Sequence, residues 1–107
     1  MRFEIVLAPS AVRELRNLRA DIRARVRDAI ERHLRHEPKR VSKSRIKRLH
    51  GLDRPQYRLR VDEVRVFYDV TEETVEVLAI VPKDQTAAWL AEKAIPAPPS
   101  GAGQGEG

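Results

Sequence analysis

The stretch YRLRV (residues 57–61) alternates apolar and cationic residues with a period of two, and RVFY (residues 65–68) follows it after three residues. A β-strand sends successive side chains to opposite faces, so the apolar residues can point into a core while Arg58 and Arg60 point away from it. A tight turn at Asp62-Glu63 would bring Arg65 of the next strand beside them. Guanidinium groups held so close together repel one another, which favours a polyanionic partner for this surface.

The same alternation extends into a predicted antiparallel meander of three strands, at about 56–61, 64–70 and 75–81. The two connections, 62–63 and 71–74, are short, and short connections join antiparallel neighbours. We expect the last strand to be covered on both sides. One predicted face carries Val75, Val77, Ala79 and Val81, and the other carries Leu78 and Ile80.

Upstream of the meander, the sequence predicts a strand over 2–8 and a hairpin of two helices. Ser10 is a plausible N-cap for the first helix, whose apolar stripe ends at Leu18, and Asp21 is a plausible cap for the second. The second helix carries its apolar residues at the spacing of one buried face. These residues are Ile22, Val26, Ala29, Ile30 and Leu34.

The remaining segments complete a single α+β domain over residues 1–95. The basic stretch 39–54 has no sustained period, so we predict a loop that contacts the core through Ile46, Leu49 and Leu52. Asp84 is a plausible cap for a short final helix over 85–94, which carries Trp89. Residues 96–107 are almost entirely Pro, Gly, Ala and Ser, which predicts a disordered tail.

Composition narrows the classes of function. With 107 residues, 41% hydrophobic content and no cysteine, the chain predicts one modest core without disulfides or thiolate metal sites. No apolar run approaches the length of a membrane span, about 20 residues, and the charged N-terminus does not resemble a signal peptide. We therefore expect a cytoplasmic protein with no membrane partner.

The net charge of +5 is unevenly distributed. Residues 1–35 hold 9 Lys or Arg and 5 Asp or Glu, residues 36–65 hold 10 and 4, and residues 66–107 hold 2 and 7. This asymmetry favours phosphate binding by the middle of the chain, although the helix arginines are also explained as a solvated surface. The candidate nucleic-acid-binding residues are Lys43, Arg45, Lys47, Arg48, His50, Arg54 and Trp89.

Two of these candidates have competing interpretations. Trp89 either stacks on an unpaired base or, as the only large residue of its helix, anchors that helix on the sheet. His50 either transfers protons near neutral pH or is an exposed loop histidine. His33 and His36 lie at the end of the second helix, where they are better explained by interaction with the helix dipole.

Taken in order, these segments resemble the RelE/ParE superfamily of bacterial type II toxins over about residues 2–90. The best-matching segments are 11–18, 48–51, 57–61, 65–68 and 77–81. The resemblance implies a small toxin neutralised by a cognate antitoxin. RelE-like members cleave mRNA in the ribosomal A site, whereas ParE-like members inhibit DNA gyrase and are not nucleases.

The resemblance also implies site residues. Arg58 and Arg60 fall where the family has paired basic residues, and Arg65 falls on its phosphate-stabilising arginine. Lys83 falls near a further basic position that is usually arginine, and Trp89 falls where many RelE-like members have a catalytic tyrosine. RelE-like cleavage uses the mRNA 2′-hydroxyl as nucleophile and needs no metal or other cofactor. Because indole is only an N–H donor, proton transfer has no assigned residue here.

These implications give three hypotheses. The favoured one is a ribosome-dependent mRNA endoribonuclease that inhibits translation, with Arg58, Arg60, Arg65 and Lys83 as catalytic residues. The alternatives are a ParE-like gyrase inhibitor and a degenerate toxin that only binds its antitoxin. The expected partners are the antitoxin, the ribosome and mRNA, and operator DNA only through the antitoxin complex.

Overall fold

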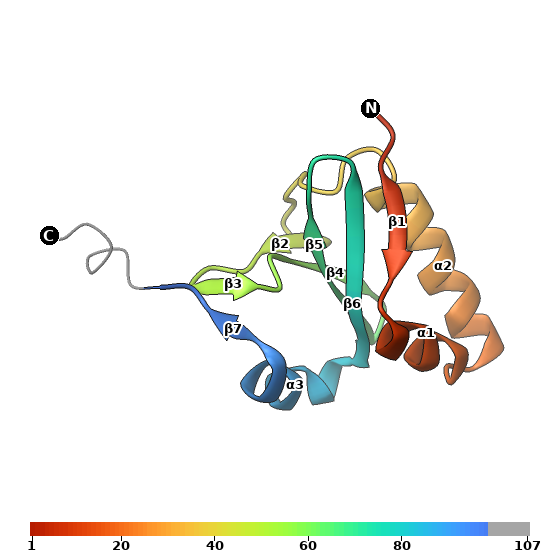
Figure 1. The fold of residues 1–107 in the computed structure, drawn as a ribbon. Coiled ribbons are helices and arrows are strands. Elements are labelled where there is room, and N and C mark those ends of the chain that lie inside the picture. The colour runs from red at the N-terminus through yellow and green to blue at the C-terminus, as the bar shows by residue number, and fades with distance from the viewer. Residues whose placement is uncertain (99–107) are drawn as a thin grey trace, which may run out of the picture.

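The computed structural model describes residues 1–98 as an α+β fold built on a five-stranded sheet (Figure 1). Its strands are β1 (Glu4–Leu7), β2 (Ile46–Arg48), β4 (Tyr57–Val61), β5 (Val64–Val70) and β6 (Thr74–Pro82). The strand order is β1-β6-β5-β4-β2, in which β1 runs parallel to β6 and the other neighbours are antiparallel. The predicted meander is therefore confirmed as β4-β5-β6, with β1 and β2 added at its two edges.

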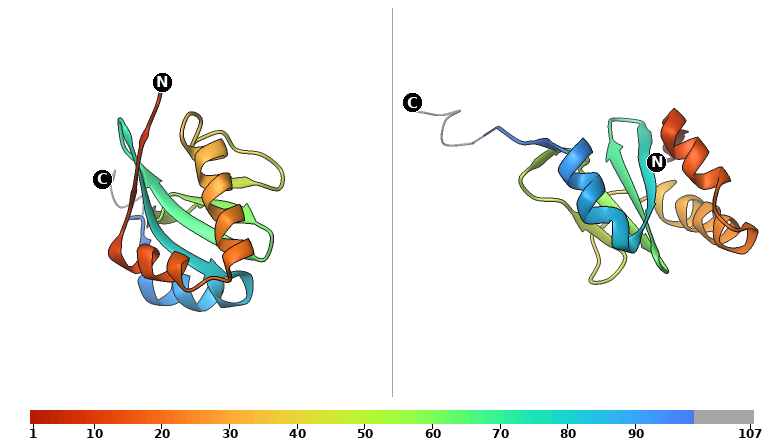
Figure 2. Two further views of the ribbon diagram at one scale, coloured as in Figure 1. Left: turned by 90° about the vertical axis from the view of Figure 1, so that its right-hand side faces the viewer. Right: turned by 90° about the horizontal axis from the view of Figure 1, so that it is seen from below.

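The helices cover the two faces of the sheet unequally. Helices α1 (Pro9–Arg16) and α2 (Ala20–Leu34) form the predicted hairpin on one face. Helix α3 (Thr86–Lys93) follows a short 3₁₀ turn, η1 (Lys83–Gln85), and lies on the opposite face (Figure 2). Because α3 is only eight residues long, much of that second face is left without a helix.

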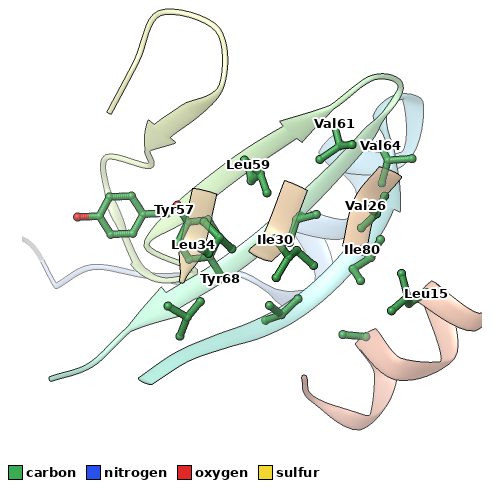
Figure 3. Close-up of a cluster of buried hydrophobic side chains, with 14 of the residues drawn as sticks. Leu15, Val26, Ile30, Leu34, Tyr57, Leu59, Val61, Val64, Tyr68 and Ile80 are labelled. Atoms are coloured by element: carbon green, nitrogen blue, oxygen red, sulfur yellow. The ribbon is translucent and has the colours of Figure 1, made fainter. Parts of the chain in front are cut away.

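The main core lies between α2 and the meander (Figure 3). Val26, Ile30 and Leu34 are buried on one side of α2, as the spacing of apolar residues predicts. They pack with residues of the sheet that include Leu59 and Tyr68, both fully buried. Burying each such side chain is worth about 1.5–3 kcal/mol, so this stripe fixes the position of the hairpin on the sheet.

Two tyrosines extend this core toward the basic stretch. Tyr57 and Tyr68 stack with their ring centroids 5.5 Å apart. The Tyr68 hydroxyl donates a hydrogen bond of 2.6 Å to the backbone oxygen of Pro38. Tyr57 is buried as predicted from strand alternation, and Figure 3 shows its hydroxyl pointing away from the cluster. The hydrogen bond from Tyr68 thus ties the segment after α2 to the centre of the sheet.

Helix α1 completes the hydrogen bonding of β6 where β1 ends. The backbone N–H of Ala8 donates to Val77, and the Ser10 hydroxyl donates to Leu78 at 3.2 Å. The Glu14 carboxylate accepts the backbone N–H of Ile80 at 2.8 Å. Ser10 therefore does not cap α1, contrary to the sequence-based prediction, because its hydroxyl is used by the sheet edge.

The other two predicted caps are also wrong. The N-cap of α2 is Arg19, and Asp21 lies in the first turn. The N-cap of α3 is Gln85, and Asp84 lies in the preceding 3₁₀ turn. In both cases the acidic residue stands near the predicted helix start without capping it.

The predicted faces of the last strand are partly wrong because β6 contains a bulge. Phe67 pairs with Ala79 but its neighbour Tyr68 pairs with Val77, so Leu78 is an extra residue in β6. A bulge of this kind reverses the alternation beyond it. Ile80 consequently joins the main core, whereas Ala79 and Val81 turn to the opposite face with Phe67.

The basic stretch 39–54 is more ordered than the predicted loop. It contains β2 and a further strand, β3 (Leu52–Arg54), which pairs with β7 (Ile95–Pro96) in a separate two-stranded sheet. Ile46 is buried in the core as predicted, and Leu49 packs against the smaller apolar cluster beneath α3. Strands of three residues are too short to show a period in the sequence.

The first two residues of the predicted tail pair with the basic stretch. Pro96 pairs with Leu52, and the backbone N–H of Ala97 donates to Gly51. The C-terminal chain therefore returns to the basic stretch after α3. The rest of the predicted tail, residues 99–107, lies outside the described residues.

Candidate functional site

The pairing of β4 with its neighbours brings the predicted arginines onto one face of the sheet. Arg60 pairs with Arg65, and Arg58 pairs with Phe67. On the other side of β4, Lys47 of β2 pairs with Arg58. Paired residues on adjacent strands share a face, so these four basic side chains belong to the face opposite the helix hairpin. We call Lys47, Arg58, Arg60 and Arg65 the cationic face.

Arg58 is partly buried within the cationic face. Its Nε atom is buried and has no hydrogen-bond partner among residues 1–98. Burial lowers the pKa of the Arg58 guanidinium from its ordinary value, and the nearby Arg65 and Arg60 guanidiniums lower it further. An anion bound beside this guanidinium would supply the opposite charge that no ion pair within residues 1–98 provides.

Arg65 lies on the predicted face, but it is buried, with only 8% of its surface exposed. One guanidinium nitrogen, Nη1, donates to the backbone oxygens of Asp62 at 2.8 Å and Val64 at 3.1 Å. Asp62 has a positive φ of 52° in the turn between β4 and β5. Burial lowers the pKa of Arg65, and Arg60 lowers it further. Arg65 therefore braces this turn while adding positive charge to the face.

Lys83 lies at one end of the cationic face. It is exposed as the first residue of η1, and its backbone N–H donates to the backbone oxygen of Glu63 at 2.7 Å. This bond holds the residue beside the turn between β4 and β5. A lysine here presents a single mobile charge rather than the planar fork of an arginine.

Trp89 anchors α3 on the sheet. Its ring stacks on that of Phe67, with centroids 4.9 Å apart and planes 7° apart. Phe67 is only 1% exposed, whereas Trp89 is half-buried. The anchoring interpretation of Trp89 is therefore confirmed. Its stacking on an RNA base stays a prediction.

The residues of the basic stretch lie around the edge of this site. Lys43, Arg45 and His50 are exposed, and His50 lies in the turn between β2 and β3. Arg48 is exposed but ordered, because it donates to the backbone oxygen of Gln56 at 2.8 Å and lies 5.2 Å from the centroid of the Tyr57 ring. These side chains extend the positive surface along β2.

Arg54 differs from the other predicted nucleic-acid-binding residues because it is already neutralised. It forms ion pairs with Asp69 at 2.9 Å and Glu76 at 2.8 Å. Asp69 also accepts the backbone N–H of Gln56, and its side chain is 13% exposed. These bonds join β3 to β5 and β6. Arg54 therefore braces the sheet in the free toxin, and phosphate binding by Arg54 stays a prediction.

Phe67 is the site residue that sequence reasoning missed. It lies two residues after Arg65 on the same strand, so strand alternation already assigns both to one face. The signal was present in the sequence, but an apolar residue in a strand is most simply assigned to the main core. Because Phe67 pairs with Ala79, beside the bulge in β6, it packs against α3 instead of joining the main core.

Within residues 1–98, no group of three or more His, Cys, Asp or Glu side chains is arranged to hold a metal ion. In the same part of the chain, no helix is long and apolar enough to cross a membrane. The positive side chains of the site are carried by β2, β4, β5 and η1.

A family profile identifies the chain. The family described as "ParE toxin of type II toxin-antitoxin system, parDE" matches residues 5–86, which is most of the sequence. The chain belongs to the ParE toxin family. The matched span contains all of the cationic face and Lys83, and it ends before Trp89 and β7.

Solved structures show that this ParE-family toxin has the fold of RelE toxins. The toxin resembles a chain of the RelB-RelE antitoxin-toxin complex from Methanococcus jannaschii, with a TM-score of 0.61, 20% identity and coverage of 78% of this chain and 96% of the other. For the RelE-RelB complex from Pyrococcus horikoshii the TM-score is 0.59 and the identity 25%, with coverage of 78% and 97%. For the RelBE2 complex from Mycobacterium tuberculosis the TM-score is 0.59 and the identity 25%, with coverage of 77% of this chain and 99% of the other.

No curated protein matched the sequence of this toxin. The family profile and the solved structures therefore establish a type II toxin with a RelE-like fold.

Proposed function

We propose that this toxin is a metal-independent endoribonuclease that cuts mRNA on the ribosome and thereby inhibits translation. The observation that supports this proposal best is the partly buried Arg58, whose Nε lacks a partner among residues 1–98 and which lies beside Arg60 and Arg65. The non-bridging oxygens of a phosphodiester become more negative as it is attacked. Preorganised donors aimed at that developing charge often contribute more to catalysis than any other single effect.

In the proposed reaction, the 2′-hydroxyl oxygen of an mRNA nucleotide attacks the adjacent phosphorus. The bond between the 2′-oxygen and phosphorus forms as the bond between phosphorus and the 5′-oxygen breaks. The 2′-hydroxyl loses its proton, and the departing 5′-oxygen gains one. The products are a 2′,3′-cyclic phosphate and a 5′-hydroxyl. Arg58 and Arg60 would bind the non-bridging oxygens, and Arg65 and Lys83 would add positive charge around them.

The cationic face is least suited to the proton-transfer step, because its residues are poor general acids and bases. Arginine has a pKa above about 12 and is a poor base, and the indole of Trp89 can only donate. One electrostatic donor is worth about 10²–10³ in rate, and a general acid or base adds about 10²–10⁴. A toxin that supplied only electrostatic donors would be slow in solution, and groups of the ribosome would have to transfer the protons.

The test is the mapping of new 5′ ends in transcripts of a translating bacterial lysate, with and without the purified toxin. We expect cuts inside codons that carry 5′-hydroxyl ends and appear only while ribosomes translate. Arg58→Ala should reduce cutting by about 10²-fold or more, whereas Arg13→Ala, which removes an exposed arginine of α1, should not. Unbroken transcripts with a folded toxin that halts growth would refute the proposal.

A cognate antitoxin is the second partner that we propose. Two of the structurally similar complexes, RelE-RelB from Pyrococcus horikoshii and RelBE2 from Mycobacterium tuberculosis, contain an antitoxin and are 25% identical to this chain. This toxin has a groove of about 320 Å³ between the helix hairpin and β1, with an apolar floor and a charged rim. Its lining residues are Ile5, Leu7, Leu15 and Ile30, together with Arg27, Glu31 and Arg35. An amphipathic antitoxin helix would fit this groove. Acidic residues of the antitoxin beside that helix would neutralise the cations of the toxin. Binding should weaken as salt rises.

Inhibition of DNA gyrase is the alternative function, and one observation favours it. The resemblance to the superfamily places Trp89 where RelE-like members have a catalytic tyrosine, and its indole, stacked on Phe67, cannot replace a tyrosine in proton transfer. In this alternative the cationic face is a binding surface. A supercoiling assay with purified gyrase separates the two functions, because only the alternative predicts inhibition in the absence of ribosomes.

A further inference from the structure

A second basic cluster lies on the helical side of β2, away from the cationic face. A hollow of about 310 Å³ is formed by the end of α2, the chain that follows it and the residues that begin β2. Its charged and titratable lining residues are Arg32, His33, His36, Glu37, Arg40 and Arg45. We call this hollow the helix-end pocket. The pocket lies at the C-terminus of α2, which is the negative end of the helix dipole and does not attract anions. Any affinity for an anion must therefore come from the side chains.

The pocket retains positive charge after its internal pairs are counted. Glu37 is paired with Arg40 at 2.9 Å, so these two charges cancel. Arg32 pairs with Asp28 of its own helix, with both side chains mostly exposed, and such exposed pairs hold each other weakly. Arg45 takes part in none of the ion pairs formed within residues 1–98.

The turn that carries Arg45 is closed by its own hydrogen bonds. The Ser42 hydroxyl accepts the backbone N–H groups of Arg45 at 3.0 Å and Ile46 at 3.2 Å. The Ser42 backbone N–H donates in turn to the Ile46 oxygen at 3.0 Å. On the far side of the pocket, His36 lies 3.2 Å from the Met1 carbonyl through Nδ1. A carbonyl only accepts, so this Nδ1 carries the proton. The pocket walls are thus held before any ligand arrives.

Arg45 connects the helix-end pocket to the cationic face. Its backbone oxygen accepts the N–H of Arg60 at 2.8 Å, and Arg60 belongs to the cationic face. The side chain of Arg45 lines the pocket on the other side of the sheet. Between the two lies only β2, an edge strand of three residues that itself carries Lys47 and Arg48. Positive side chains therefore continue from one face to the other around this edge.

We propose that the helix-end pocket binds a phosphodiester of the RNA backbone, so that RNA held at the cationic face continues around the β2 edge. This inference rests on the proposed function in taking RNA as the target. Several arginines in one pocket favour phosphate, whose oxygens match the guanidinium fork. Continuity with a second basic surface favours an extended polyanion over a single carboxylate.

His33 makes the affinity of the pocket depend on pH. Burial lowers the pKa of His33 from its ordinary value of 6.5, the nearby Arg45 and Arg32 lower it further, and Asp28 opposes them. The imidazole is therefore mostly neutral at pH 7. A bound phosphate would favour its protonated form. Affinity should consequently rise as the pH falls, and His33→Gln should reduce that rise.

The test is the binding of the full-length toxin to a fluorescent oligouridylate without a terminal phosphate, measured by anisotropy over a range of salt concentrations. We expect Arg32→Ala and Arg45→Ala each to weaken binding about fivefold and to reduce the slope of log affinity against log salt by about 0.7, the value for one phosphate on a single strand. Arg13→Ala removes one exposed arginine elsewhere and is the matched control. Uridine phosphodiesters do not titrate between about pH 5.5 and 8, so the part of a pH effect that His33→Gln removes is assigned to His33.

Two results would overturn the inference. In the first, Arg32→Ala and Arg45→Ala bind like Arg13→Ala. In the second, they lose affinity for polyglutamate but not for oligouridylate, which would assign the pocket to an acidic protein segment. The proposed function is judged separately, by transcript cleavage with Arg58→Ala. Cleavage that depends on Arg58, together with unchanged RNA binding by the pocket variants, would refute only the pocket. Wild-type toxin that neither binds oligouridylate nor cuts transcripts would refute both.

Discussion

Removal of a single hydroxyl, by Tyr68→Phe, tests whether the core holds the basic stretch in place. The Tyr68 hydroxyl donates to the Pro38 carbonyl at 2.6 Å, and both residues are fully buried. The substitution keeps the ring and its stacking on Tyr57, so the change in packing is small. It leaves the Pro38 carbonyl without its donor, and an unsatisfied buried polar group costs about 1–3 kcal/mol. We expect the free energy of unfolding to fall by about 2 kcal/mol.

Urea denaturation followed by the fluorescence of Trp89 is the appropriate assay. In a thermal unfolding experiment, the same loss of about 2 kcal/mol would lower the melting temperature of a domain of this size by roughly 8–16 °C. The midpoint of urea unfolding should fall while the slope of free energy against urea is unchanged. Tyr57→Phe is the matched control, because Tyr57 belongs to the same stacked pair but directs its hydroxyl away from the cluster (Figure 3). Its effect should stay below about 0.5 kcal/mol.

Equal effects of Tyr68→Phe and Tyr57→Phe would refute this reasoning. That result would mean that loss of the hydrogen bond to Pro38 lowers the free energy of unfolding no more than loss of the Tyr57 hydroxyl does. The start of the basic stretch would then be held by Ile46 and its neighbours in the core, and its position would not depend on Tyr68.

Further predictions follow from single contacts. Glu14→Ala should lower the free energy of unfolding by about 1–2 kcal/mol because it leaves the N–H of Ile80 unpaired, and Glu14→Gln should restore most of the loss in urea unfolding. Arg65→Ala should cost about 1–2 kcal/mol by releasing the β4–β5 turn. Arg60→Ala, at an exposed position, should cost less than about 0.5 kcal/mol by the same measurement. Burial raises the pKa of Tyr68 above its ordinary value. Above about pH 10 the unfolded chain therefore loses a proton that the folded chain keeps, and stability should fall by about 1.4 kcal/mol per pH unit. Urea midpoints against pH should show a smaller alkaline loss for Tyr68→Phe than for the wild type.

Long periodic segments could be predicted from the sequence, and short ones could not. The stripe on α2 and the alternation of β4 extend over enough residues for the period to identify both the element and its buried face. Strands β2, β3 and β7 have two or three residues and are formed by pairing with distant partners. The bulge at Leu78 is also a product of pairing, because its register depends on β5 rather than on β6 alone.

The candidate site was predictable to a similar extent. Alternation assigned Arg58 and Arg60 to one face, and a short turn brought Arg65 beside them, as the register shows. Alternation does not reveal which cations are already neutralised. Arg54 appears equivalent to its neighbours in the sequence, but its partners Asp69 and Glu76 come from β5 and β6 and meet it only in the folded sheet.

The distribution of ion pairs separates structural cations from available ones. Within residues 1–98, the ion-paired arginines of the helices and of the chain after them have carboxylate partners two to four residues away, except Arg25, which pairs with Asp62 in the turn between β4 and β5. None of the ion pairs in that part of the chain includes Arg58, Arg60 or Arg65. Arg58 is partly buried and Arg65 is buried, and burial lowers the pKa of each guanidinium. Burial of an unpaired cation carries a desolvation cost, because it removes water without supplying an opposite charge. For Arg65, the hydrogen bonds to Asp62 and Val64 outweigh this cost. Carboxylates from the acidic C-terminal third of the chain could have neutralised them, as they neutralise Arg54. Within residues 1–98, none of these carboxylates forms an ion pair with an arginine of the cationic face, and this supports our proposal of an external anion there more strongly than the net charge of +5 does.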